Sequence, residues 1–157
     1  MDAVFSLEIN EYRKHRNVQL NLKCVLAPIE YTDKLSRDET RYREIINGAR
    51  YSIEDDIYPT RSEFALLYTY IKRKTCGKSA DFSLRELISE CSVKGDNPGI
   101  KLRFMLDIFE EMKLLEIVRH DGDYDIEYNI TVKFVRGKVN LDKSLILKSL
   151  RSKQEKV

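Results

Sequence analysis

The sequence predicts an α+β fold, and two patterns along its 157 residues support this prediction. Apolar and polar residues alternate near the N-terminus, as in a β-hairpin with one buried face. Farther along the chain, apolar residues recur at helical spacing in several segments before strict alternation returns. On these grounds the sequence divides into a hairpin at 1–31, a connector helix and linker at 32–58, and a C-terminal domain at 59–157.

The N-terminal hairpin is predicted from two apolar runs that flank a short polar segment. The runs contain Phe5, Leu7 and Ile9, followed by Val18, Leu20 and Leu22. Strand character is expected to end near Tyr31. A two-stranded sheet is marginally stable and leaves its edges unpaired, so we expect the hairpin to pair with itself in a homodimer or to fold back on the C-terminal domain.

The connector helix is predicted to begin at a capping box formed by Ser36 and Glu39 and to end at Gly48. Its apolar stripe is thin and its surroundings are highly charged, which indicates a connector rather than a core helix. The next segment, YSIEDDIYP, is interpreted as a linker that ends at Pro59.

The C-terminal domain is predicted to begin with three helices. Capping boxes at TRSE (60–63) and SLRE (83–86) begin the first two helices, and Pro98 begins the third. The large aromatic side chains in these helices are expected to be core residues rather than stacking platforms, namely Tyr68, Tyr70, Phe104 and Phe109.

A hairpin and a last helix are predicted to follow. Asp121-Gly122 is a turn signal between two strands, and apolar residues then alternate as far as Phe134. A last helix is expected from about Asp142. Three helices followed by a hairpin is the order of elements in a winged helix, and the C-terminal domain is therefore predicted to be winged-helix-like.

Composition and charge limit the class of protein. No apolar run approaches the roughly 18 residues needed to span a bilayer, and the N-terminus lacks the features of a signal peptide. The three cysteines are widely spaced, which favours a reduced, cytoplasmic setting with Cys91 as a core residue. The net charge is only +2, but residues 115–130 carry one basic and five acidic groups, whereas residues 131–157 carry eight basic and two acidic groups.

Four stretches resemble the C-terminal region of bacterial RecJ-type single-stranded-DNA-specific exonucleases of the Firmicutes type. VFSLEINEYRKHRNVQLNL (4–22) resembles the last strands of the oligonucleotide-binding (OB) barrel of that family. YPTRSEFALLYTYI (58–71), MLDIFEEMKLLEI (105–117) and KVNLDKSLIL (138–147) resemble its extra C-terminal domain. The stretches run in the family's order over nearly the whole chain.

The resemblance implies a C-terminal fragment of a 5′–3′ single-strand exonuclease of DNA repair and recombination, with the hairpin as a remnant of an OB fold. The manganese-dependent nuclease of that family lies in preceding domains built around Asp-His-His motifs. No catalytic residue and no metal or other cofactor is therefore expected in this chain. Its expected role is accessory, in substrate handling or protein docking, with other domains of the parent exonuclease, single-stranded DNA or another DNA-repair protein as partners and no membrane.

Two basic segments are candidate nucleic-acid contacts. The polar tip of the N-terminal hairpin offers a ring for stacking and cations for phosphates, in Tyr12, Arg13, Lys14 and Arg16. The basic segment that follows the second hairpin offers Lys133, Arg136 and Lys138. A purely solvated surface is the alternative interpretation of both segments.

The third helix of the C-terminal domain is predicted to present an acidic face. At 100° per residue, its solvent side carries Arg103 with Asp107, Glu110 and Glu111. This composition disfavours contact with a polyanion and favours a basic partner. The candidate docking residues are therefore Asp107, Glu110, Glu111 and, on the second hairpin, Asp123. A free-standing winged-helix regulator that binds duplex DNA remains the alternative function.

Overall fold

The structure of the chain is a computed structural model that describes residues 2–12, 15–26, 29–122 and 125–155. The fold is α+β, as the sequence predicts. The described residues form five α-helices and, among their sheets, one antiparallel sheet of three strands. The chain separates into two compact units, Met1–Lys34 and Leu35–Val157, and each is described by itself.

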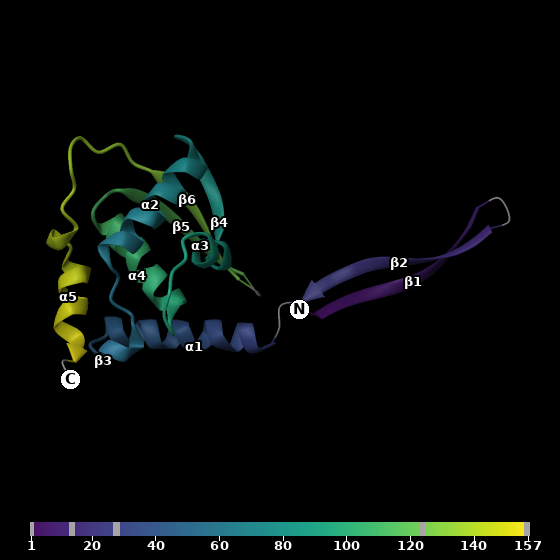
Figure 1. Cartoon of the computed structure of the whole chain (residues 1–157), viewed down its shortest axis with the longest axis horizontal. Coiled ribbons are helices and arrows are strands. Elements are labelled where there is room, and N and C mark those ends of the chain that lie inside the picture. The colour runs from purple at the N-terminus through teal and green to yellow at the C-terminus, as the bar shows by residue number, and fades with distance from the viewer. Residues whose placement is uncertain (1, 13–14, 27–28, 123–124, 156–157) are drawn as a thin grey trace. The chain divides into compact units, whose positions relative to one another are not determined.

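The first unit contains a long β-hairpin, formed by β1 (Asp2–Tyr12) and β2 (His15–Leu26) (Figure 1). The register pairs the two predicted apolar runs, with Phe5 opposite Leu22, Leu7 opposite Leu20 and Ile9 opposite Val18. The predicted hairpin is thus confirmed. The expected burial of this face is wrong at its outer pair, because Ile9 and Val18 are each 70% exposed.

Helix α1 (Ile29–Ile46) begins before the predicted capping box, so the expected strand as far as Tyr31 is wrong. Ser36 lies inside the helix, where its carbonyl oxygen accepts a hydrogen bond from Thr40 Oγ1 at 3.0 Å. The sequence from Ile29 to Asn47 contains neither glycine nor proline, so nothing in it prevents a longer helix. The helix ends as predicted before Gly48, which has a φ of +113°.

The predicted linker after α1 is part of the core. Tyr51 and Ile57 are each only 1% exposed. The short strand β3 (Tyr51–Ser52) pairs in parallel with β7 (Gln154–Glu155), and a 3₁₀ turn follows β3 at Ile53–Asp55. The interpretation of this segment as a linker is wrong. Charged residues lie at its centre, but two of its apolar side chains, Tyr51 and Ile57, are buried in the core.

Three further helices follow: α2 (Arg61–Thr75), α3 (Leu84–Glu90) and α4 (Pro98–Glu111). The capping box at 60–63 is confirmed by reciprocal hydrogen bonds between Thr60 and Glu63. At 83–86, only half of the predicted box is present. The Ser83 hydroxyl caps α3 by accepting a hydrogen bond from the Glu86 amide, at 3.1 Å, whereas the Glu86 carboxylate binds other side chains.

The antiparallel sheet has the strand order β4-β6-β5, formed by β4 (Ser79–Ser83), β5 (Leu115–Asp121) and β6 (Ile126–Val132). Strands β5 and β6 are the predicted hairpin, whereas β4 was not predicted. The alternating pattern overstates the length of β6, because Phe134 lies beyond the strand and is 89% exposed. A 3₁₀ turn at Leu141–Lys143 leads into α5 (Leu145–Lys153).

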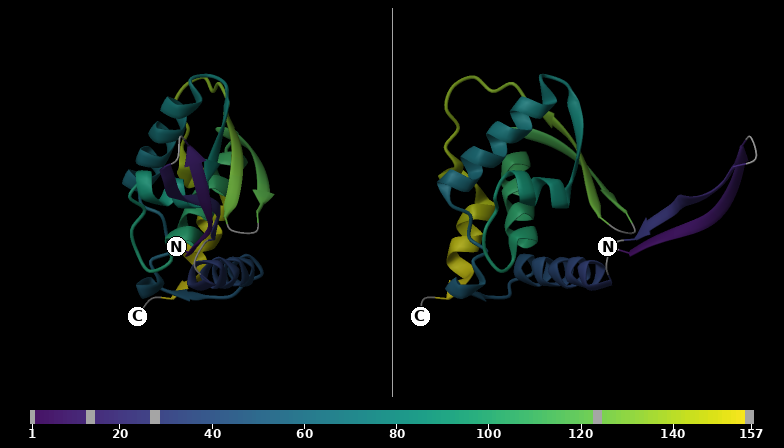
Figure 2. Two further views of the ribbon diagram at one scale, coloured as in Figure 1. Left: turned by 90° about the vertical axis from the view of Figure 1, so that its right-hand side faces the viewer. Right: turned by 45° about the vertical axis from the view of Figure 1, so that its right-hand side comes forward.

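Helix α4 is the centre of the second unit (Figures 1 and 2). Nine of its residues are buried, and Glu110 is the only exposed residue of Pro98–Glu111. The core also contains the predicted residues Phe104, Phe109 and Cys91, whereas Tyr68 and Tyr70 are half-buried against it. None of the helices in the described ranges combines the length and the apolar character that crossing a membrane requires.

Candidate functional site

A wide groove of about 1110 Å³ lies between α2, the segment that joins β6 to α5, and α5 itself. In Figures 1 and 2, this joining segment arches away from the helices before it returns to α5. We call the cleft the basic groove, because its wall contains more cations than carboxylates. The polar and aromatic side chains that define it are Tyr58, Arg61, Tyr68, Lys72, Asp142 and Arg151.

The cations of the basic groove are largely open to solvent. Arg61 pairs with Asp142 at 3.0 Å, yet its side chain is 90% exposed. Lys72 and Arg151 are exposed, and no carboxylate of the described residues lies within ion-pair distance of either. Exposed cations along a cleft attract polyanions, because they remain available to phosphate groups.

Two tyrosine rings lie on the same wall. Tyr68 packs against the buried Phe109, with a centroid distance of 5.6 Å and an interplanar angle of 58°. Tyr68 and Tyr58 are half-buried, so part of each residue remains accessible. An aromatic ring that is held by packing and still partly exposed can stack a nucleobase without sequence preference. The basic groove therefore combines both chemical elements of a single-strand binding surface.

The predicted basic segment lies next to this groove in the chain. Lys133, Arg136 and Lys138 are all exposed, and Lys133 forms an ion pair with Glu116 of β5. The other wall residues come from elements far apart in the sequence. Arg151 belongs to the basic C-terminal segment that the charge distribution identifies, but no local signal in the sequence links it to Tyr58 or Arg61.

The predicted contacts at the hairpin tip fall in the first unit. The backbone of Tyr12 pairs with that of His15, and the backbone of Arg16 with that of Glu11. Arg13 and Lys14 lie outside the described residues. The same holds for Asp123, the predicted docking residue on the second hairpin.

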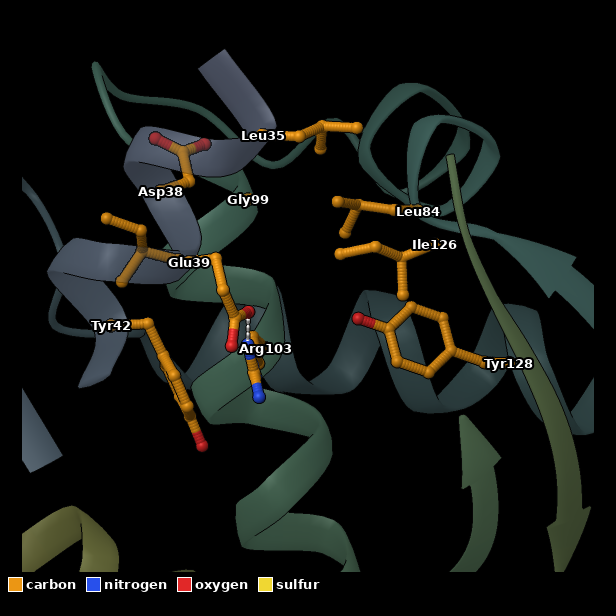
Figure 3. Close-up of a pocket in the computed structure, with 10 residues that line it drawn as sticks. Leu35, Asp38, Glu39, Tyr42, Leu84, Gly99, Arg103, Ile126 and Tyr128 are labelled. Atoms are coloured by element: carbon orange, nitrogen blue, oxygen red, sulfur yellow. Dashed lines mark hydrogen bonds and ion pairs between the residues drawn. The ribbon is translucent and has the colours of Figure 1, made fainter. Parts of the chain in front are cut away.

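The predicted solvent face of α4 is largely covered. Arg103 forms an ion pair with Glu39 of α1, and its guanidinium carbon lies 3.6 Å from the centroid of the Tyr42 ring (Figure 3). Arg119 of β5 joins the same carboxylate at 3.1 Å. The expectation that Arg103 faces solvent is therefore wrong, because α1 packs along this side of α4.

The predicted docking carboxylates differ in their surroundings. Asp107 is half-buried and accepts a hydrogen bond from the Tyr42 hydroxyl. Glu111 is half-buried and binds the N-terminus of α5 through Ser144 and the amides of Leu145 and Ile146. Only Glu110 is exposed as predicted. A fully solvated acidic face is thus wrong for Asp107 and Glu111, which both have partners within the chain.

A small cavity between α1, α3, α4 and β6 is enclosed by the residues drawn in Figure 3. Its volume is about 10 Å³, far below the several hundred Å³ of a typical ligand pocket. Tyr128 points into this region, and its buried hydroxyl has no hydrogen-bond partner among the described residues. Burial raises the pKa of Tyr128 to about 12. The cavity is too small for a substrate.

Asp107→Asn is expected to raise the melting temperature at neutral pH. Burial raises the pKa of Asp107 above its ordinary value, against the opposing effects of Tyr42 and Arg103. A raised pKa in the folded state means that stability is fully present below the ordinary pKa of 3.8 and is lost as the pH rises through the folded pKa. Asparagine can still accept the Tyr42 hydrogen bond and carries no charge.

Thermal unfolding at pH 4 and pH 7 checks this expectation. The stabilisation by Asp107→Asn should be larger at pH 7, and Asp96→Asn at an exposed position should change little at either pH. A variant less stable than the parent at pH 7 would show that the charge of Asp107 helps to hold the fold.

The described residues form an α+β fold with the basic groove of about 1110 Å³ and a cavity of about 10 Å³ between α1, α3, α4 and β6. In the described ranges, no group of three or more histidine, cysteine, aspartate or glutamate side chains is placed to hold a metal ion. Comparisons with known protein families, with curated proteins and with solved structures found no significant match.

Proposed function

We propose that this chain is a non-catalytic module that holds single-stranded DNA in its basic groove, as an accessory part of a RecJ-type exonuclease. The observation that carries the proposal is the basic groove itself, where Arg61, Lys72 and Arg151 surround two accessible tyrosine rings. Stacking on aromatic rings and neutralisation of phosphates are the two interactions by which proteins hold single strands. The resemblance of four stretches to the C-terminal region of that exonuclease family supports the assignment of a RecJ-type exonuclease as the parent enzyme.

The arrangement of the second unit supports a winged-helix-like domain that does not read duplex DNA. Its order α2-β4-α3-α4-β5-β6 is that of a winged helix, and α4 would take the place of the recognition helix. In duplex-reading helix-turn-helix proteins, that helix enters the major groove. Here Glu110 is the only exposed residue of α4, and the half-buried Arg103 is already paired with Glu39, so the helix offers duplex DNA no free basic side chain. The pairing of β1 with β2 is compatible with a remnant of an OB barrel.

Binding to labelled oligonucleotides tests the proposal. An oligothymidine of about 20 nucleotides should bind more tightly than a duplex of the same length, as measured by fluorescence anisotropy. Three phosphate contacts predict that the logarithm of the affinity falls with the logarithm of salt concentration with a slope of about −2. Tighter binding of the duplex, with a steeper slope, would instead favour the winged-helix regulator.

Variants locate the binding site. Lys72→Gln and Arg151→Gln should each weaken single-strand binding and reduce the salt slope by about 0.7, because each removes one phosphate contact. Tyr68→Leu should weaken binding by about 1 kcal/mol or more through lost stacking. Lys78→Gln, at an exposed lysine outside the groove wall, is the matched control. Equal effects of Lys78→Gln and Lys72→Gln would remove the groove as the site.

A further inference from the structure

A second groove lies on the other side of α5, with walls from α1, α4 and α5. Its volume is about 620 Å³. We call it the acidic groove and define it by five residues that face it, namely Ile46, Asp107, Glu110, Leu145 and Ile146. Grooves between helices are a common seat for an amphipathic helix, which places its apolar face against them.

Large apolar side chains are exposed at both walls of the acidic groove. Ile46 of α1 is 49% exposed, and Leu145 of α5 is 71% exposed. Ile146 is half-buried beside Leu145, and the buried Phe104 of α4 also lines the groove. Apolar residues from three helices thus meet at one concave surface, and a partner that covered them would gain hydrophobic free energy.

The wall of this groove is negatively charged, because it contains three carboxylates and one lysine, although the charges of Arg103 and Arg119 partly offset that of Asp107. Among the described residues, no cation lies within ion-pair distance of Asp107 or Glu110. Lys153 is the one cation in the wall of the groove as described, and its Nζ donates hydrogen bonds to the carbonyl oxygens of Ile45, at 2.6 Å, and Ile46, at 3.1 Å. Lys153 therefore holds the end of α1 and does not neutralise the carboxylates.

We propose that the acidic groove binds a basic amphipathic helix of a partner protein. Leucine-like side chains of that helix would cover Ile46, Leu145 and Ile146, and its lysine or arginine residues would pair with Asp107 and Glu110. Charge complementarity selects this occupant, because carboxylates outnumber cations in the wall of the groove and repel nucleic acid and acidic peptides. The inference is independent of single-strand binding, which uses the opposite side of α5.

The chemistry of Asp107 supports this assignment. Its carboxylate is half-buried and bound to the Tyr42 hydroxyl, so water solvates it incompletely. A partner cation would return the stabilisation that burial removes from the charged form. The same residue is thus expected to destabilise the free chain and to strengthen the complex. A residue with a purely structural role would stabilise the free chain, so opposite effects of Asp107 on the stability of the free chain and on the affinity for the peptide indicate a binding role.

A designed peptide provides the test with the full chain. The probe is a fluorescein-labelled helical peptide of about 16 residues that contains leucine on one face and lysine on the other. The control peptide has the same composition in a scrambled order without an apolar face. The amphipathic peptide should bind at least about fivefold more tightly than the scrambled one in anisotropy titrations, since its apolar face adds to the charge attraction.

Variants of the groove decide between specific and general attraction. Asp107→Asn, Glu110→Gln and Leu145→Ser should each weaken binding by about fivefold, or ~1 kcal/mol. Glu90→Gln and Leu66→Ser, at exposed positions outside the groove, are the matched controls and should leave binding unchanged. Asp107→Asn should weaken binding although it raises the melting temperature, which excludes unfolding as the cause.

Three results would overturn the inference. The first is equal affinity of the scrambled and the amphipathic peptide, and the second is control variants that weaken binding as much as the groove variants do. Light scattering that shows a dimer dissociated by Leu145→Ser would assign the groove to a second copy of the chain instead.

Discussion

Replacement of Lys101 by methionine is expected to lower the free energy of unfolding by about 3 kcal/mol. Lys101 lies in α4 and is 1% exposed, yet it is charged. Its Nζ lies 3.1 Å from Glu63 Oε1 and 2.8 Å from Asp56 Oδ2, and donates to the carbonyl oxygen of Lys94 at 3.1 Å. It thereby joins α4 to the N-terminus of α2 and to the loop that precedes α4.

The stability lost in Lys101→Met arises mainly at Glu63, whose side chain is only 13% exposed. Burial works most strongly against ionisation of Glu63, but the hydrogen bonds from Thr60 and the charge of Lys101 together lower its pKa below the ordinary value. Methionine fills a similar volume and leaves this carboxylate buried without its cation. Removal of one partner from a buried ion pair is far more destabilising than replacement of both.

Urea unfolding of single and double variants tests this explanation. Lys101→Met combined with Glu63→Gln should recover part of the loss, because glutamine keeps the capping box without a charge. Lys94→Met, at an exposed neighbouring lysine, should stay within about 0.5 kcal/mol of the parent. A Lys101→Met variant as stable as the parent would show that the ion pairs contribute nothing to stability.

Glu111→Gln is expected to cost about 2 kcal/mol at neutral pH, because it weakens the cap of α5. The Glu111 carboxylate accepts hydrogen bonds from the Ser144 hydroxyl and from the amides of Leu145, at 2.8 Å, and Ile146, at 3.3 Å. Ser144 is fully buried, and its hydroxyl also accepts a hydrogen bond from the Leu147 amide at 3.0 Å. Glu111 therefore connects the end of α4 to the start of α5.

The stability lost in Glu111→Gln should become smaller as the pH falls. Burial is the largest influence on Glu111 and opposes its ionisation, but the three hydrogen bonds and the charge of Lys148 together lower its pKa below 4.5. A lowered pKa in the folded state gives stability that is present above the ordinary pKa and lost as the pH falls through the folded pKa. The difference between Glu111→Gln and the parent should therefore shrink on acidification, and a constant difference between pH 7 and pH 3 would contradict this account.

Helix α5, which Glu111 caps, lines both grooves. Leu147 and Arg151 face the basic groove, whereas Leu145, Ile146 and Lys153 face the acidic groove. The helix is held at its start by Glu111 and near its end by the hydrogen bond from the Tyr51 hydroxyl to the Leu150 carbonyl oxygen, at 3.0 Å. Loosening of α5 is thus expected to disturb the walls of both grooves together.

Local signals in the sequence predicted the elements that depend on local physics. Alternation predicted the N-terminal hairpin and the pairing of its apolar runs, and the Thr60–Glu63 capping box and Pro98 fixed the starts of α2 and α4. These features depend on residues close together in the chain, whose side chains either repeat along one strand or satisfy the first amides of a helix.

Elements that depend on distant partners were missed. Strand β4 alternates only Ala80 and Phe82 with polar residues, a pattern too short to predict a strand, and it forms through its pairing with β6. The two residues of β3 are a strand only because β7 lies beside them, about one hundred residues later in the chain. The early start of α1 was missed because Ser36 and Glu39 match a cap by spacing alone.

The candidate site was predicted only in part. The charge distribution indicated the basic segment with Lys133, Arg136 and Lys138, which lies next to residues of the groove wall in the chain, and the helical projection placed only Glu110 correctly on an exposed side of α4. The projection could not show that α1 covers Arg103 or that α5 takes up Glu111, because it contains no neighbouring helix. Prediction of the basic groove also requires the tertiary structure, since residues of both α2 and α5 form its wall.

The most direct test of the central claim is a titration of the isotope-labelled chain with oligothymidine, followed by the chemical shifts of its backbone amides. Single-strand binding in the basic groove predicts that the largest shifts occur at 58–72 and 135–151, with little change along 98–108 of α4. Shifts concentrated in α4, or confined to the hairpin at 2–26, would contradict the account.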